Sequence, residues 1–131
     1  MALLEVKNLV KSYGGRNVLD GVSFVLEEGE AKVVMGPSGC GKSTLLRCLN
    51  LLIEPTSGSI LLDGKDIARP GVDVREVRSR IGFVFQNFAL YRHMSVLDNV
   101  TLALRRLKKI PRREAEERAL HELNRMELAE K

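Results

Sequence analysis

The sequence contains no tryptophan, only two cysteines and few aromatic residues, which make up 5% of its 131 positions. No uninterrupted apolar run is longer than four residues, so no segment could cross a bilayer as a helix. The N-terminus lacks the basic and long apolar regions of a secretory signal. Cys40 and Cys48 do not form the spaced set of a disulfide framework or a zinc site, which favours a reducing, cytosolic environment.

The composition is that of a folded domain. Apolar residues make up 44% and charged residues 29%, with 11 glycines and 4 prolines, which excludes a disordered, collagen-like or low-complexity chain. The length corresponds to about one domain. The net charge of +4 is small and compatible with a phosphate ligand or an anionic surface. The charge is uneven, because six basic residues fall within residues 105–113.

The first third of the sequence predicts β-strands, at residues 3–10 and 22–26, separated by a turn that contains two glycines. Residues 31–35 form a short β-prone run that ends in glycines. From Lys42 onward the hydrophobic period is helical, and one face carries the apolar residues Leu45, Cys48, Leu49, Leu52 and Ile53. A proline and a glycine shortly after this face are expected to end the helix.

The middle of the sequence predicts a hairpin, a short helix and a further strand. Asp63-Gly64 is a strong turn signal after the apolar residues 60–62. A short polar helix is expected over 72–80. The nearly continuous apolar run 81–85 predicts a strand that is covered on both faces.

The last third predicts two helices. Ser95 followed by Asp98 fits a capping box at the start of the first helix. Pro111 suits the start of the second, in which Glu114 and Arg118 form an i,i+4 pair in the favourable order. No clear stop signal follows, so the second helix is expected to run to the end of the sequence.

The clearest chemical pattern is a glycine-rich loop between the β-prone run and the first helix. It matches G-x-x-x-x-G-K-[S/T] and consists of Gly36, Pro37, Ser38, Gly39, Cys40, Gly41, Lys42, Ser43 and Thr44. Glycines let backbone N–H groups approach a polyphosphate without an obstructing Cβ atom. The helix N-terminus adds free N–H groups and its positive dipole end, and Lys42 adds a full charge. The Ser43 hydroxyl is placed to ligate Mg²⁺. The pattern therefore predicts a site for a nucleoside triphosphate and Mg²⁺; the alternative is a glycine-rich loop with an unrelated lysine.

Given this loop, the segments 35–58 and 81–86 resemble the nucleotide-binding subunit of ABC transporters, over roughly the first half of such a subunit. The resemblance implies an α/β fold: an incomplete P-loop NTPase core with an N-terminal antiparallel β subdomain and the start of a helical subdomain. The expected boundaries are 1–30 and 58–68 for the β subdomain, 31–57 and 80–86 for the core, and 95–131 for the start of the helical subdomain.

The resemblance also implies roles for individual residues. Tyr13 matches the aromatic residue that stacks on adenine, and Thr44 matches a residue whose hydroxyl approaches the α-phosphate. Gln86 matches the Q-loop glutamine, whose amide oxygen can reach Mg²⁺ and the attacking water. Lys42 and Gln86 are thus the expected catalytic residues, and Ser43 and Gln86 the expected metal ligands. For Tyr13 and Gln86 the alternative is a structural role at the end of a strand.

Residues 86–99 are expected to contact membrane subunits. In the family this region meets the coupling helices of the permease, and here residues 88–91 are apolar or aromatic. Local packing beneath the helix from Ser95 is the alternative. Residues 45–60 and 93–101 are most similar to importers of polar amino acids. The resemblance implies an ATP hydrolase that is homodimeric when complete, is held by permease subunits on the cytoplasmic face of the cell membrane, and has no direct contact with nucleic acid.

Several motifs of the family have no match after Gln86: the signature motif, the Mg²⁺-binding aspartate, the adjacent catalytic glutamate and the switch histidine. Asp63 also follows an apolar run, but it precedes Gln86 and is followed by glycine, so we interpret it as a turn residue. His93 and His121 precede the place of the switch histidine, and we interpret both as surface residues.

Three hypotheses follow. The first is a truncated ABC ATPase that binds Mg-ATP weakly and hydrolyses it poorly alone. The second is a non-catalytic interaction fragment that docks on permease subunits or on an intact ATPase partner. The third is a DNA-repair-type ABC ATPase, suggested by the basic run 105–113, although the adjacent glutamates fit a solvated helix end better.

Within the glycine-rich loop, Cys40 lies near a helix N-terminus, so thiol reagents are expected to block nucleotide binding. The alternative is that Cys40 is a small residue that merely fits the loop.

Overall fold

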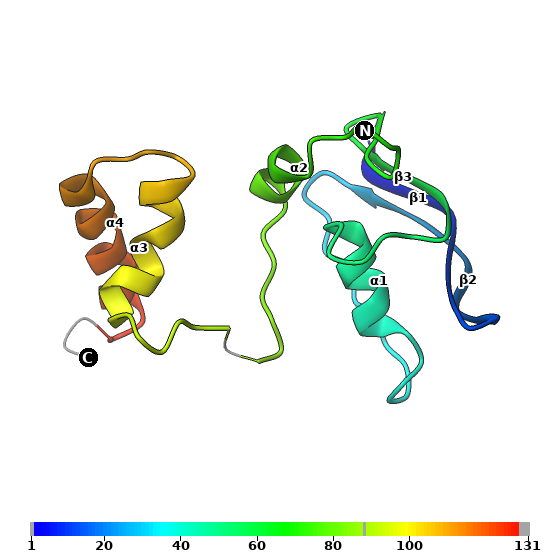
Figure 1. Ribbon diagram of the computed structural model, residues 1–131, viewed down its shortest axis with the longest axis horizontal. Coiled ribbons are helices and arrows are strands. Elements are labelled where there is room, and N and C mark those ends of the chain that lie inside the picture. Colours follow the sequence, from blue (N-terminus) through cyan, green and yellow to red (C-terminus); the bar gives the residue numbers. More distant parts are fainter. Residues whose placement is uncertain (1, 88, 129–131) are drawn as a thin grey trace. The chain divides into compact units, whose positions relative to one another are not determined.

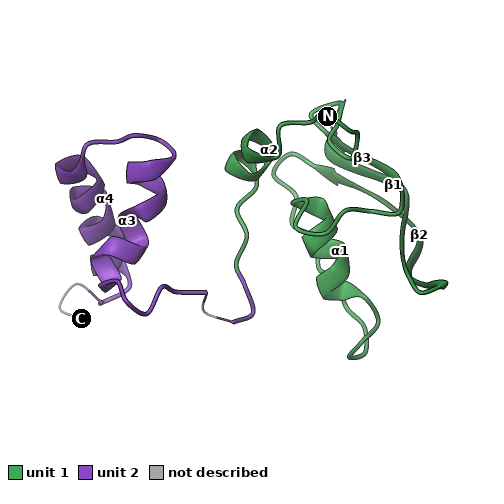
Figure 2. Ribbon diagram, in the orientation of Figure 1, with its two compact units in different colours: residues 1–84 green, residues 85–131 purple. Residues whose placement is uncertain are grey.

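The structure is a computed structural model that describes residues 2–87 and 89–128. The chain divides into two compact units, residues 1–84 and 85–131 (Figure 2). The first unit contains a sheet and the glycine-rich loop, and the second contains a helical hairpin. None of the helices formed by the described residues has the length and apolar character needed to cross a membrane.

An antiparallel sheet organises the first unit (Figure 1). β1 (Ala2–Tyr13) pairs with β2 (Arg16–Glu27) across the turn at residues 14–15, where both glycines have positive φ, as a tight hairpin requires. β3 (Ser57–Leu62) pairs with the other edge of β1, and β4 (Lys65–Asp66) follows through a tight turn. The strand order is β2-β1-β3-β4. The strands predicted at 3–10 and 22–26 and the hairpin at Asp63-Gly64 are confirmed, and β1 and β2 are longer than expected.

The core of this unit lies between the sheet and α1 (Lys42–Leu49). Leu4 and Val6 face inward along β1, and a register shift between Val6 and Leu9 brings Leu9 to the same face. Leu9, Ile60 and Cys48 have no exposed surface. Burial of side chains the size of leucine contributes about 1.5–3 kcal/mol each, so this packing fixes α1 against the sheet.

α1 begins where predicted but ends four residues before the end of its predicted apolar face, at Leu49. Leu51 adopts a left-handed backbone conformation with φ of 62°. The Leu52 N–H then donates to the Arg47 carbonyl at 2.9 Å, and the Leu51 N–H donates to the Cys48 carbonyl at 3.1 Å. This pair of bonds is a Schellman motif, which stops a helix by satisfying its last carbonyls.

α2 (Val74–Arg80) confirms the predicted short helix. The Asp73 carboxylate caps it by accepting backbone N–H groups of the first turn. The Arg78 guanidinium donates to the carbonyls of Asn50 at 3.3 Å and Leu51 at 2.9 Å. α2 is thereby joined to the C-terminal end of α1.

The two strands expected in the core, 31–35 and 81–85, are not formed. Val33, Met35 and Val84 are 82%, 85% and 96% exposed. Strands of this apolar kind require neighbouring strands and cover on both faces. The described residues form only the four strands of the antiparallel sheet, and these two segments remain outside it.

The second unit is built on α3 (Val96–Arg106) and α4 (Arg112–Arg125), which pack around the buried residues Thr101, Ala115 and Ala119. The Ser95 hydroxyl accepts the Asp98 N–H at 3.0 Å, which confirms the predicted N-cap. The predicted pair within α4 is also present, with Glu114 Oε1 2.9 Å from Arg118.

The expected end of α4 is wrong. The helix ends at Arg125, because Glu127 adopts a left-handed conformation with φ of 59°. The Leu128 N–H donates to the Leu123 carbonyl at 2.8 Å, and the Glu127 N–H donates to the Asn124 carbonyl at 3.0 Å. A second Schellman motif therefore stops this helix. Residues 129–131, over which the helix was also expected, lie outside the described residues.

Candidate functional site

The glycine-rich loop is exposed and leads directly into α1. Gly39 and Gly41 have φ of 80° and 103°, which L-amino acids with a Cβ atom rarely adopt. A Cβ atom at Gly41 would also lie 3.0 Å from the Val18 carbonyl oxygen, and one at Gly36 would lie 2.7 Å from Cys40 Sγ. Glycine is therefore needed at 39 and 41 for the loop to keep this course, whereas a Cβ atom at 36 would require the Cys40 side chain to move.

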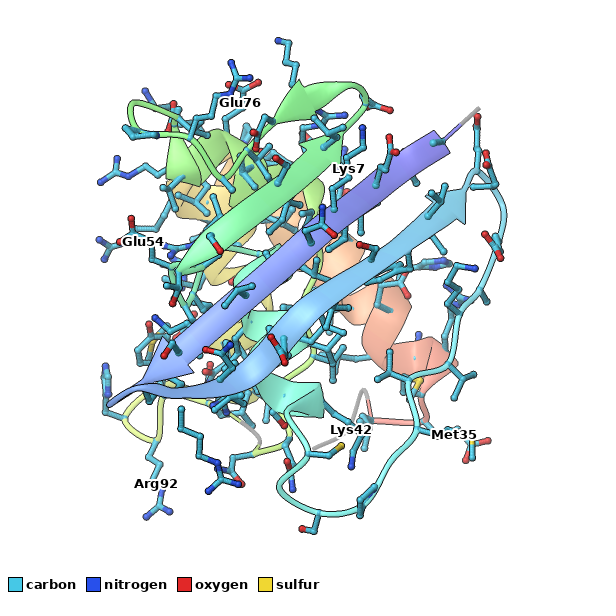
Figure 3. The ribbon with its side chains drawn as sticks, turned by 90° about the vertical axis from the view of Figure 1, so that its right-hand side faces the viewer. Lys7, Met35, Lys42, Glu54, Glu76 and Arg92 are labelled. Atoms are coloured by element: carbon cyan, nitrogen blue, oxygen red, sulfur yellow. The ribbon has the colours of Figure 1, made fainter. Side chains whose placement is uncertain are left out.

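Lys42 folds back into the loop that precedes it. Its ammonium donates to the carbonyl oxygens of Gly36 and Pro37, at 2.8 Å for the second, and lies 3.7 Å from Cys40 Sγ. The Cys40 N–H also donates to the Pro37 carbonyl, at 3.3 Å. Figure 3 shows Lys42 where the loop enters α1, with Met35 on the stretch that leads into the loop. The loop thus curls around one cation.

The N-terminus of α1 is well suited to an anion. Its N-cap is Gly41, which has no side chain to accept a hydrogen bond, and its first turn contains no acidic residue. The first backbone bond of the helix runs from the Leu45 N–H to the Gly41 carbonyl, so the N–H groups of residues 42–44 precede that ladder. These groups and the helix dipole favour negative charge at this end.

Tyr13 belongs to the same unit as this loop. It pairs with Arg16 at the end of the β1–β2 hairpin. Arg16 stands two positions before Val18, which is the residue that Gly41 approaches. Tyr13 as a whole residue is 49% exposed, and the Lys11 ammonium lies 5.0 Å from the ring centroid. The structure therefore brings Tyr13 and the residues of the loop, Ser38, Ser43 and Thr44 included, into one unit. Sequence reasoning did not single out Lys11, which stands two positions before Tyr13 on the same strand.

Gln86 belongs to the second unit, where it is exposed. The loop belongs to the first unit and each unit is described by itself, so the catalytic and metal-binding roles of Gln86 stay predictions. Phe88, which was part of the predicted permease contact, lies outside the described residues. No group of three or more His, Cys, Asp or Glu side chains within 2–87 and 89–128 is placed to hold a metal ion. The donors available for Mg²⁺ are instead hydroxyl and amide oxygens, the hard ligands that this ion prefers.

A groove of about 490 Å³ lies in the second unit between the segment after Gln86 and α3. Tyr91, Met94, Leu102 and Leu107 contribute apolar lining, and Arg106 contributes charge. The segment is held by Asn99, a residue that sequence reasoning did not single out. The Asn99 side chain accepts the Tyr91 N–H at 2.8 Å and donates to the carbonyls of Tyr91, Met94 and Ser95.

Three residues that imitate family motifs have ordinary positions. Asp63 lies in the turn between β3 and β4 and pairs with Arg80, which confirms its interpretation as a turn residue. His93 is exposed and meets Tyr91 edge-on, with ring centroids 5.9 Å apart. His121 is exposed on α4. Both histidines are surface residues, as predicted.

Comparison with known proteins gives concordant results. Residues 19–131 match a sequence family described as ABC transporter. The chain is 40% identical over 127 residues to the glutamate/glutamine/aspartate/asparagine transport ATP-binding protein BztD of Rhodobacter capsulatus, covering 97% of this chain and 48% of BztD. It is 43% identical over 129 residues to the arginine transport ATP-binding protein ArtM of Bacillus subtilis, covering 98% of this chain and 54% of ArtM.

A solved structure, the dimeric ATP-binding cassette MJ0796 bound to ADP and Pi, superposes with a TM-score of 0.79 at 34% identity. The match covers 92% of this chain and 56% of the cassette. The similarity confirms the predicted fold class, including its incomplete core. The chain spans about half the length of the curated relatives it matches.

Proposed function

The chain belongs to the ABC transporter family of ATP-binding proteins, and from this premise we propose that it binds Mg-ATP as the energy-coupling subunit of an importer of polar amino acids. The names of its relatives, which transport acidic amino acids, their amides and arginine, support that substrate class. The observation that carries the proposal is the loop at residues 36–42, curled around the Lys42 ammonium at the start of a helix that has no acidic first turn.

Each residue of the site has a proposed role. Backbone N–H groups of residues 38–44 bind the phosphates, and Lys42 moves its ammonium from the loop carbonyls to the β- and γ-phosphate oxygens. Thr44 approaches the α-phosphate, and the Tyr13 ring stacks on adenine. Ser43 and Gln86 would hold Mg²⁺, which would neutralise charge on the phosphate oxygens. Gln86 also orients the attacking water.

We propose that these 131 residues alone hydrolyse ATP poorly. Phosphoryl transfer depends on groups that position water and stabilise charge on the γ-phosphate oxygens. The sequence after Gln86 contains neither the acidic pair nor the signature motif and switch histidine that do this in the family. A second copy of these 131 residues lacks the same groups, so the homodimer is proposed for the complete subunit only.

The second proposed partner is a permease, which would bind the second unit. The groove beside α3, with exposed Leu90 and Tyr91 near its rim, supports docking of permease subunits through residues 86–99. This docking places the protein on the cytoplasmic face of the cell membrane. The same groove supports a second candidate function, that of a non-catalytic fragment which occupies a permease or an intact ATPase partner.

Nucleotide binding is tested by titrating the purified chain with ATP and Mg²⁺ in a calorimeter. Lys42→Met should weaken binding roughly 10- to 100-fold, because hydrogen bonds to charged groups contribute about 1.5–3 kcal/mol. Lys32→Met is the matched control, since it removes the same charge from a lysine that pairs with Glu30 at 2.7 Å. Equal affinities of the Lys42→Met variant and the unaltered chain would refute the proposal.

A further inference from the structure

Lys11 and Tyr13 form a pair at the end of β1. The Lys11 ammonium lies over the Tyr13 ring, 5.0 Å from its centroid. At this distance a cation is attracted to the π-electrons of the ring and restrains its orientation. Because the Tyr13 residue is 49% exposed, its side chain keeps surface for a second, planar partner. The ammonium and the exposed ring surface together make a prepared stacking platform.

Both members of the pair are anchored to the loop that follows α1. The Lys11 ammonium also donates to the Glu54 carbonyl at 2.9 Å. One residue further along β1, the Ser12 N–H donates to Thr56 Oγ1 at 2.9 Å, and the Thr56 N–H donates back to the Val10 carbonyl at 2.8 Å. The backbone that carries Tyr13 and the cation that faces its ring are therefore held by the same short segment, residues 54–56.

We propose that Lys11 is a positioning residue for adenine, acting through Tyr13. This proposal rests on the proposed nucleotide site. Lys11 holds the Tyr13 ring in its stacking orientation before the nucleotide binds. Side chains ordered in advance do not lose conformational freedom on binding, and affinity rises accordingly. Lys11 itself contacts neither phosphate nor base, so its contribution depends on the presence of the base.

This dependence separates the proposal from two plainer roles. If Lys11 only attracted anions, any polyphosphate would lose affinity when the charge is removed. If Lys11 only stabilised the fold through Glu54, its removal would lower the unfolding midpoint and affect every ligand equally. Inorganic tripolyphosphate, which carries the phosphates without adenine, distinguishes these cases.

The experiment uses the full chain with the substitution Tyr91→Phe, which leaves Tyr13 as the single tyrosine, since the sequence has two tyrosines and no tryptophan. Tyrosine fluorescence then reports stacking on Tyr13 directly, and calorimetry measures the affinities for ATP and tripolyphosphate with Mg²⁺. The variants are Lys11→Met, which keeps an unbranched apolar stem, and Lys11→Arg, which keeps a cation over the ring. Lys7→Met, on the same strand beside Glu5, is the matched control.

Lys11→Met should weaken ATP binding roughly three- to tenfold, reduce the fluorescence change on ATP addition, and leave tripolyphosphate affinity within about twofold, as expected when one side chain loses its prior ordering. Lys11→Arg should restore ATP affinity, and Lys7→Met should change neither ligand. Equal weakening of both ligands, or unchanged ATP affinity, would overturn the assignment of Lys11. If the unaltered chain binds neither ligand, the nucleotide site itself is refuted, and this assignment with it.

Discussion

At the scale of single residues, the two cysteines have opposite environments. Cys40 is exposed in the glycine-rich loop, where its Sγ lies 3.7 Å from the Lys42 ammonium. Cys48 has no exposed surface on the inner face of α1, and burial raises the pKa of its thiol above the ordinary value of 9.0. The thiolate is the reactive form, so burial and the raised pKa both protect Cys48 from reagents.

We therefore predict that N-ethylmaleimide at pH 7.5 modifies Cys40 alone in the folded chain, and that the adduct abolishes ATP binding. Mg-ATP should slow the modification, because the bound phosphates occupy the loop that carries Cys40. Intact-mass measurement and peptide mapping count and locate the adducts. The Cys40→Ala variant should stay unmodified until it is unfolded. Retained ATP affinity after complete alkylation of Cys40 would contradict the prediction.

At the scale of elements, the sequence predicted the starts of α1, α3 and α4 but not the ends of α1 and α4. The start of α3 is signalled by Ser95, whose side-chain oxygen accepts a backbone N–H in the structure. For α2 the end at Arg80 was predicted, whereas the start lies two residues later than expected, after Asp73. The ends of α1 and α4 are made instead by left-handed Leu51 and Glu127. Glycine usually occupies such positions, so the sequence shows the usual stop signal at neither of these two helix ends. The sequence also did not predict that the Leu9 side chain faces the core, because this orientation depends on a β-bulge in β1.

Glu127→Gly should stabilise the second unit by about 0.5–1 kcal/mol, because glycine adopts a left-handed conformation without the steric penalty of a Cβ atom. The same substitution inside α4, Glu117→Gly, should destabilise it by about 1 kcal/mol. Urea unfolding followed by the helical circular dichroism signal compares the two variants. A loss of stability in Glu127→Gly would show that the left-handed position is not strained.

At the scale of the whole molecule, the antiparallel sheet and the helical hairpin form, whereas the core strands expected over 31–35 and 81–85 do not. The sequence predicted the loop, its lysine and the fold class, because these depend on local spacing and on motifs of the family. Strand formation over 31–35 was not predictable in the same way, since it depends on neighbouring strands from elsewhere in a sheet. Val33 and Met35 remain 82% and 85% exposed as a result.

The exposure of residues 31–35 can be tested by substitution. Val33→Lys and Met35→Lys should each change the free energy of unfolding by less than about 0.5 kcal/mol, as surface substitutions usually do. Both should reduce the fluorescence of a dye that binds exposed apolar surface. Val77→Lys, at a position in α2 that is 6% exposed, is the control and should destabilise the chain severely. An equally severe effect at Val33 would mean that residues 31–35 are buried.

The hydrogen bonds between Lys42 and its own loop have a consequence for anion binding. Since the Lys42 ammonium already donates to the carbonyls of Gly36 and Pro37, an incoming anion has to compete with two acceptors that are always present. A halide offers a single acceptor atom, whereas a phosphate group offers several charged oxygens and competes better for the ammonium. Linked phosphates present such oxygens over a greater length, so one group can meet Lys42 while another meets the N–H groups at the start of α1.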